Sequence, residues 1–192
     1  ELCFGTTSLE HPAVMHLVKE KARFNIGGRI FGRALPERSW VTCKTPRQVR
    51  ATLDQSKPII FFQTRNPTHR AHAAMFLHVA KEYRGAQVIV NPIIGPSKSD
   101  DVPAQVRVQT YEALAKRLTH VKFMYLPYSM MVGGPRECLQ HIIIRKNFGA
   151  TGMIVGRDHA GCKDFSGKDF YGPSDAQTFL AQHTDELKME MV

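Results

Sequence analysis

The sequence is poor in cysteine and has no long apolar run. Its four cysteines lie far apart and form no C-x-x-C pair: Cys3, Cys43, Cys138 and Cys162. This spacing argues against a zinc site and a disulfide framework, and it favours a reducing compartment. No apolar run approaches the ~18 residues that span a membrane, so we expect no membrane partner. No signal peptide is visible, and we expect a cytoplasmic protein, or a plastid one if a transit peptide precedes Glu1.

Acidic residues are outnumbered by basic ones. The chain holds 26 Lys and Arg against 17 Asp and Glu, which gives a formal net charge of +9. This excess favours anionic ligands such as phosphate, sulfate or nucleic acid, but a basic surface kept for solubility explains it equally well. The basic residues are scattered, and no strand face interleaves them with aromatic residues. We therefore expect no nucleic-acid partner.

The first 50 residues have a different pattern from the rest of the chain. Within residues 24–36, glycine pairs, short β-prone stretches and a proline predict strands and turns. Thr45 and Pro46 then form a cap and first-turn pair that predicts a linker helix. We therefore divide the chain into residues 1–50 and residues 51–192.

In the second part, apolar runs of strand length alternate with helical patterns. The predicted strands are residues 58–63, 86–95, 121–127 and 151–156, and the predicted helices are residues 67–83, 103–118 and 135–149. This alternation is typical of an α/β fold with a parallel sheet and right-handed crossovers. Ligands of open α/β sheets bind beyond the C-terminal ends of the strands, so the polar segments that follow the strands form the candidate site.

The first of these segments is "QTRNPTHRAH", which begins at Gln63. Asn66 followed by proline is a helix-start pair, and the free N–H groups and dipole of a helix start favour an anion. Arg65 is a bidentate cation beside the neutral donor Gln63. His69 and His72 share a face of the expected first turn, where imidazoles can stabilise charge that develops on a phosphate.

Each of these residues also has a purely structural interpretation. Asn66 can do no more than start a helix, and Arg65 can be a solvated loop residue. His69 and His72 can be zinc ligands, but they lack the glutamate of H-E-x-x-H and have no cysteine nearby. We therefore predict no metal held by the protein itself.

The second segment, "IVGRDHAG", follows the last predicted strand and ends at residue 161. Gly156 lets a ligand approach the backbone closely, and Arg157 is placed to neutralise a phosphate. Asp158 is suited to accept from a ribose hydroxyl or to orient His159. The alternative is an ion pair between Arg157 and Asp158 that closes the loop. No P-loop and no G-x-G-x-x-G follows a strand, which disfavours a P-loop kinase and a dinucleotide dehydrogenase.

Taken in order, "QTRNPTHRAH", "GPRE", "IIRKN", "GRDHAG" and "DFYGPSDAQ" resemble the motifs of ATP sulfurylase (sulfate adenylyltransferase). Residues 1–50, with "FGTTSLEHPAV" and "IGGRI", resemble the end of that family's β-rich, PUA-like N-terminal domain. Residues 51–192 resemble its nucleotidyltransferase catalytic domain, which would be incomplete at its C-terminus. The resemblance implies a Rossmann-like parallel sheet and, for the full-length protein, a homo-oligomer.

The resemblance also implies an activity and a set of site residues. The family transfers the AMP unit of ATP to sulfate in sulfate assimilation, with Mg²⁺ accompanying ATP, and it forms adenosine 5′-phosphosulfate and pyrophosphate. By resemblance, the sulfate site is Gln63, Arg65 and the backbone of Ala160, and the catalytic residues are Thr64, Arg65, Asn66, His69 and His72. The implied ATP site is Gln63, Arg65, Asn66, His69, His72, Gly156, Arg157, Asp158 and His159. Sulfate is a poor nucleophile, so catalysis should rest on positioning and charge neutralisation.

The alternative is a catalytically silent module of the same fold that binds nucleotide or serves assembly. Met131 stands where the family loop often carries an arginine, Cys162 replaces a proline, and Ser174 replaces an aromatic residue. The chain also ends at Val192, before family segments that help to hold adenine. A silent module predicts nucleotide binding without turnover.

Overall fold

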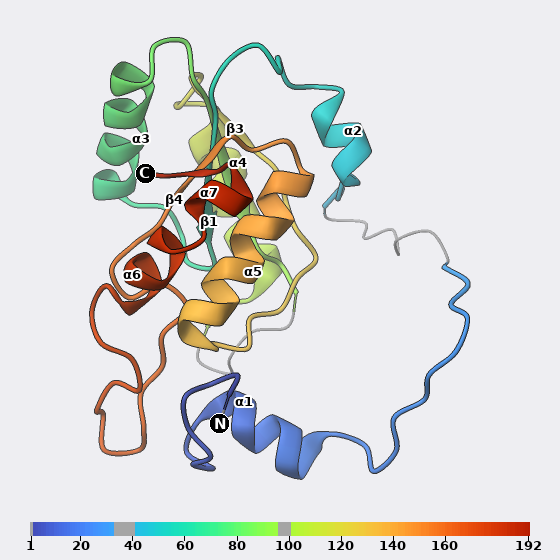
Figure 1. Ribbon diagram of the computed structural model, residues 1–192. Helices are drawn as coiled ribbons and strands as arrows, with labels where there is room; N and C mark the ends of the chain where they lie inside the picture. Colours follow the sequence, from blue (N-terminus) through green and yellow to red (C-terminus); the bar gives the residue numbers. More distant parts are fainter. Residues whose placement is uncertain (1, 33–40, 96–100) are drawn as a thin grey trace.

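A parallel five-stranded sheet forms the centre of the molecule (Figure 1). This computed structural model describes residues 2–32, 41–95 and 101–192. The strand order is β3-β2-β1-β4-β5, and every neighbouring pair is parallel. The strands are β1 (Ile59–Thr64), β2 (Gln87–Pro92), β3 (Val121–Phe123), β4 (Gly152–Ile154) and β5 (Glu190–Met191). The predicted parallel α/β fold is confirmed.

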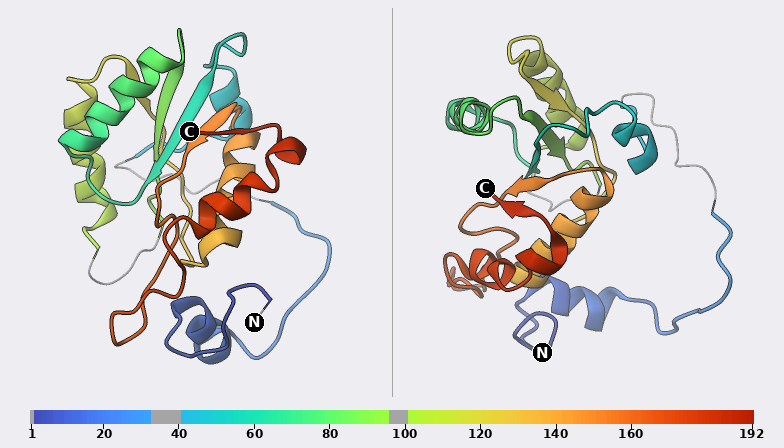
Figure 2. Two further views of the ribbon diagram at one scale, coloured as in Figure 1. Left: turned by 60° about the vertical axis from the view of Figure 1, so that its left-hand side comes forward. Right: turned by 45° about the horizontal axis from the view of Figure 1, so that its top comes forward.

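Helices cover both faces of the sheet, as the left panel of Figure 2 shows. One face carries α3 (Arg70–Glu82) and α4 (Ala104–Ala115). The other carries α5 (Gly134–Asn147), with α2 (Pro46–Arg50), α6 (Asp175–Ala181) and α7 (Thr184–Leu187) beside it. The alternation of side chains along β1 builds both cores. Ile59 and Phe61 pack with α5, whereas Ile60 packs with α3.

The start of α3 differs from the prediction. The helix begins at Arg70, and Asn66 is not its cap. The backbone of Asn66 is instead held in a turn: its N–H donates to Thr64 Oγ1 at 3.1 Å, and its carbonyl accepts from the hydroxyl of Tyr111 at 2.7 Å. Because Tyr111 lies on α4, a tertiary contact outweighs the local helix signal here. The predicted cap at Thr45 is confirmed, since its Oγ1 accepts from the N–H of Gln48.

The strands predicted within residues 24–36 are wrong for residues 24–32, which form no strand and lie exposed. Residues 33–36 fall outside the described part. The N-terminal segment contains instead a short helix, α1 (Pro12–Met15), and one π-helical turn, η1 (His16–Glu20). A PUA-like N-terminal part therefore stays a prediction. None of the helices in the described ranges has the length and hydropathy that crossing a bilayer requires.

The segment before α1 is docked on the loop that precedes α6. His11 is buried, and its Nε2 lies 2.8 Å from the hydroxyl of Tyr171. His11 Nδ1 accepts from the backbone N–H of Ala13, so the ring donates to Tyr171 through Nε2. The hydroxyl of Tyr171 in turn donates to the carbonyl of Phe4 at 3.0 Å. Residues far apart in sequence therefore border the same surface.

Candidate active site

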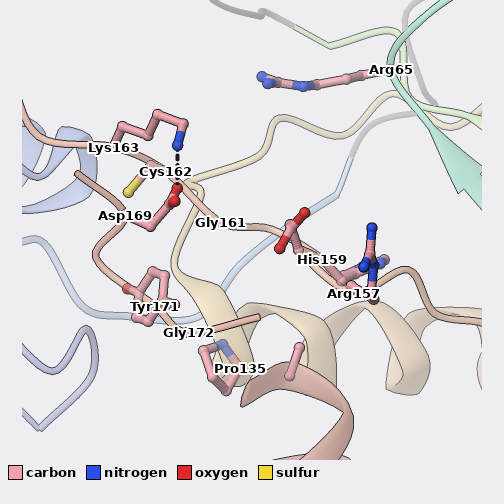
Figure 3. A pocket seen from close by; sticks show the side chains of 12 residues that line it. Arg65, Pro135, Arg157, His159, Gly161, Cys162, Lys163, Asp169, Tyr171 and Gly172 are labelled. Atoms are coloured by element: carbon pink, nitrogen blue, oxygen red, sulfur yellow. Dashed lines mark hydrogen bonds and ion pairs between the residues drawn. The ribbon is translucent and has the colours of Figure 1, made fainter. Parts of the chain in front are cut away.

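A pocket of about 380 Å³ opens beyond the C-terminal ends of β1 and β4 (Figure 3). We name the segment 65–69 the β1 loop and the segment 155–161 the β4 loop. The pocket is lined by residues of both loops, by the start of α5 and by the segment before α6, among them Arg65, Pro135, Arg157, Asp158, His159, Lys163, Asp169 and Tyr171. Its position is the one that the strand-end rule predicts for a ligand site.

Two arginines supply positive charge from different loops. Arg65 comes from the β1 loop, and its Nη1 lies 3.5 Å from Oδ2 of Asp101, with 26% of the arginine side chain exposed. Arg157 comes from the β4 loop and is exposed. Arg157 and Asp158 form no ion pair with each other among the ion pairs of the described residues. The alternative interpretation, in which such a pair closes the β4 loop, is therefore not the observed arrangement. The pocket is thus suited to an anionic ligand.

Behind the pocket wall lies a buried polar network centred on His141 of α5. Nδ1 of His141 lies 3.1 Å from Nε2 of Gln63 and 3.0 Å from Nε2 of His159. Nε2 of His141 lies 3.3 Å from Oε1 of Glu137, one helical turn earlier, which is an ion-pair distance without hydrogen-bond geometry. His141 is fully buried and Glu137 is 5% exposed. The network therefore joins β1, α5 and the β4 loop, with His141 and Glu137 buried and His159 half-buried at the pocket.

The Glu137 carboxylate also holds the backbone just before α5. Its Oε2 accepts from the N–H of Gly133 at 2.7 Å, and its Oε1 accepts from the N–H of Met131 at 2.8 Å and from the hydroxyl of Tyr128 at 3.1 Å. Burial by itself raises the pKa of Glu137, but His141 and these backbone donors outweigh it, so the pKa lies below its ordinary value. Glu137 is therefore a carboxylate that faces donors on several sides.

Both imidazoles of the network are neutral at neutral pH. Burial lowers the pKa of His159 to about 3, and the neighbouring His141 and Arg145 lower it further in the same direction. Burial is also the main cause that lowers the pKa of His141. Since Nε2 of His141 faces the Glu137 carboxylate, we assign its proton to Nε2. Its Nδ1 then offers one lone pair, which the Gln63 amide and Nε2–H of His159 share.

The histidines at the start of α3 lie elsewhere. The rings of His69 and His72 have centroids 3.9 Å apart, and His72 packs on Phe62 at 5.2 Å. Burial, then the neighbouring His69, lowers the pKa of His72. Phe62 belongs to the α3 face of the sheet, whereas Gln63 points to the α5 face. Among the described residues that line the pocket, neither of these histidines appears.

The structure therefore brings together some of the predicted residues and separates others. Arg65, Arg157, Asp158 and His159 line one pocket, and Gln63 reaches it through His141. Three further predicted residues border it through the backbone or lie beside it. Thr64 is buried at the end of β1, Gly156 is exposed in the β4 loop, and Ala160 adopts a φ of 59° while its carbonyl accepts from the N–H of Gly134.

Comparison with known proteins agrees with these motifs. Residues 41–192 match the model of the ATP-sulfurylase family. The chain belongs to the ATP-sulfurylase family. It is 44% identical to the sulfate adenylyltransferase of Mycosarcoma maydis, with 98% of this chain and 34% of that protein covered. It is 38% identical to the sulfate adenylyltransferase of Schizosaccharomyces pombe, with 100% of this chain and 40% of that protein covered. The chain thus spans between a third and two-fifths of the length of these relatives.

A solved structure shares the fold. It is the hexameric APS kinase from Thiobacillus denitrificans, which superposes with a TM-score of 0.58 over 78% of this chain and 27% of that chain. The sequence identity is 22%, so this likeness shows the arrangement of the parallel sheet and its helices and nothing about activity.

The structure places the three positions at which this chain differs from the motifs that it resembles. Cys162 lines the pocket and is buried. Met131 contributes its backbone N–H to Glu137. Ser174 adopts a left-handed φ of 72° directly before α6, and its N–H donates to the carbonyl of Arg157 at 3.0 Å. Two of the three therefore act here through the backbone.

Sequence reasoning missed Glu137, His141 and Arg145 in this ATP-sulfurylase chain. They lie four residues apart along α5, so they share one face, and all three are buried. Nε and Nη2 of Arg145 have no hydrogen-bond partner in the described residues. A polar stripe at helical spacing inside a predicted core helix was the available signal, because such residues remain buried only when they have partners or a function.

Proposed function

We propose that this chain carries the nucleotide and sulfate site of a sulfate adenylyltransferase, which transfers the adenylyl group of ATP to sulfate and releases pyrophosphate. The observation that carries the proposal is the pocket lined by Arg65 from the β1 loop and Arg157 from the β4 loop. Two cations from separate loops are suited to two anions, the phosphates and sulfate. Family membership and the identities near 40% support the same reaction.

In this proposal, the residues act by positioning and by charge. Arg65 and the Gln63 amide hold sulfate, with the Ala160 backbone beside them, and Arg157, Asp158 and His159 hold the nucleotide. Because sulfate is a weak nucleophile, the rate depends on how well the arginines neutralise the charge of the reacting groups.

Residues at the start of α3 complete the proposal. Thr64, Asn66, His69 and His72 are proposed to border the ATP phosphates where these extend from the pocket along the β1 loop. The part-exposed His69–His72 pair supports this role, because its rings remain accessible to a ligand.

Magnesium would enter with ATP. Within the described ranges, no three His, Cys, Asp or Glu side chains gather to hold a metal ion. The exposed Asp158 carboxylate at the pocket fits a hydrated Mg²⁺ that is bound mainly by phosphate oxygens, which is how this ion commonly binds. When bound, Mg²⁺ would neutralise part of the phosphate charge.

Further features are proposed from the family resemblance alone. Residues 1–50 are the end of a PUA-like domain, the full-length protein is a homo-oligomer, and its location is cytoplasmic or plastid.

A silent nucleotide-binding module is the second candidate. The ion pair between Arg65 and Asp101 favours it, because a ligand must compete with that carboxylate for the guanidinium. Met131 favours it too, since it brings no charge to the loop before α5.

The test is sulfate-dependent release of pyrophosphate from Mg-ATP, with Arg65→Ala as the decisive variant. We expect release that requires sulfate and that falls on the order of 10²–10³-fold in Arg65→Ala. The matched control is Arg84→Ala, because Arg84 is exposed and lies beyond the end of α3; it should keep wild-type activity. Release that is indifferent to sulfate or to Arg65→Ala contradicts the proposal. ATP binding without release supports the silent module.

A further inference from the structure

One face of α5 points polar side chains into the interior behind the pocket. Glu137 and His141 are one turn apart, and both are buried. Buried carboxylates and imidazoles are costly unless they have partners, and here the partners come from three separate segments. These are Gln63 at the end of β1, His159 in the β4 loop and the backbone of residues 131 and 133.

His141 contacts both halves of the proposed site through one atom. Its Nδ1 is 3.1 Å from the Gln63 amide nitrogen and 3.0 Å from Nε2 of His159. Gln63 belongs to the proposed sulfate side, and His159 lines the pocket on the nucleotide side. A rotation of the His141 ring would therefore move both groups at once.

The proton positions follow from the charge of Glu137. Its carboxylate accepts from two backbone N–H groups and the Tyr128 hydroxyl, and it has no proton of its own to donate. The negative charge 3.3 Å from Nε2 of His141 favours the proton on that nitrogen, which leaves Nδ1 as an acceptor. A neutral His159 can donate to this acceptor only through Nε2–H, so its own Nδ1 stays unprotonated.

We infer that Glu137 and His141 are positioning residues: Glu137 fixes the tautomer of His141, and His141 fixes the Gln63 amide and the tautomer of His159. The inference rests on the proposed function, because it takes Gln63 and His159 as ligand-binding groups. His159 then presents a lone pair rather than a positive charge. It suits a hydroxyl or amino donor of the nucleotide, and the positive charge at the pocket comes from Arg65 and Arg157.

Two substitutions of one residue test this inference. His141→Asn places an amide oxygen where Nδ1 was, so it keeps an acceptor for Gln63 and His159. His141→Gln places its amide where Nε2 was, so it keeps a contact with Glu137 and loses that acceptor. Both variants remove the same imidazole ring from the same buried position. If His141 had only a structural role, the two variants would lose activity and stability to the same extent. His120→Asn is the control, because His120 is exposed and outside α5.

We expect the two variants to separate in steady-state kinetics. His141→Gln should raise KM for both sulfate and ATP by about tenfold, the loss that one well-oriented hydrogen bond explains. His141→Asn should stay within about threefold of wild type. Equal losses in both variants, tracking their melting temperatures, would show that the network only stabilises the fold.

A second measurement needs no turnover. Correlation of imidazole ¹⁵N and ¹H signals in histidine-labelled protein reports which ring nitrogen carries the proton. Wild type should show a neutral His159 with Nε2–H and a neutral His141 with Nε2–H. Glu137→Gln should give mixed tautomers of His141. A protonated Nδ1 on His159 in wild type, or unchanged His141 signals in Glu137→Gln, overturns the inference.

The two measurements also separate failure of this inference from failure of the proposed function. If the wild-type chain releases no pyrophosphate, the proposed reaction fails, while the imidazole signals still decide the tautomers. If His141→Gln does not fold, wild type, His141→Asn and Glu137→Gln still decide the tautomers.

Discussion

The β1 loop and the β4 loop carry similar residues in different surroundings. Each follows a parallel strand and offers an arginine and a histidine to the same end of the sheet. After β4, His159 is tied to the buried His141 and is held neutral. After β1, His69 is exposed, and its ring lies against the ring of His72. The comparison teaches that the surroundings, and not the residue type, set the pKa of His159.

The two loops should differ most in what their histidines contribute to the free energy of unfolding. His159→Ala removes a partner of the buried His141 and leaves a small cavity, and we expect it to lower the free energy of unfolding by about 2–3 kcal/mol. His69→Ala, at an exposed position, should change it by less than about 0.5 kcal/mol. Denaturant titration of both variants checks this. Equal losses of unfolding free energy in the two variants would mean that the two histidines are equally important to the packing of their loops.

The second largest effect should be the pH dependence of the free energy of unfolding. The folded pKa of His159 is lowered from 6.5 to about 3, so the unfolded chain binds a proton there that the folded chain does not. Its contribution to stability is complete above pH 6.5 and is lost as the pH falls towards 3. Between pH 7.5 and 5.5 this one group should remove about 1.4 kcal/mol.

One variant isolates this effect. His159→Asn should flatten the fall of unfolding free energy between these two pH values. A wild-type chain that is equally stable at both pH values would contradict the neutral state of His159.

The smallest effect on stability should come from the exposed charged side chains at the rim of the pocket. Lys163 and Asp169 form an ion pair at 2.7 Å, with 59% and 61% of their side chains exposed. Such pairs contribute little, so Lys163→Ala, Asp169→Ala and the double variant should give a coupling energy below about 0.5 kcal/mol. Denaturant unfolding of all three variants measures it. A coupling above 1 kcal/mol would show that the rim is as important to stability as the buried network.

The sequence predicted the parallel fold and the edge of the sheet at which the pocket lies, because both depend on local patterns. Alternating strand and helix signals gave the parallel sheet, and the strand-end rule selected Arg65 and Arg157. The sequence-based prediction failed where contacts between distant segments determine the local structure. The start of α3 was misplaced because the hydroxyl of Tyr111 holds the carbonyl of Asn66. Nothing local to residues 63–72 indicates such a contact.

The buried polar network was missed for a similar reason. Glu137 lies in the first turn of α5 and His141 one turn later, whereas the predicted site residues all lie at or after the ends of strands. The separation of Gln63 from His72 also depends on the pleat of β1, since adjacent side chains on a strand point to opposite faces. Gln63 faces α5, and Phe62, which packs on His72, faces α3. A motif read as one cluster is therefore divided between two faces of the sheet.

The most direct measurement is a titration of the ¹⁵N-labelled 192-residue chain with Mg-ATP, followed by NMR. If the β1 and β4 loops form one nucleotide site, signals of Arg65–His72 and of Gly156–His159 should shift together along a single binding curve. Two curves with different dissociation constants, or shifts confined to one loop, would contradict a shared site.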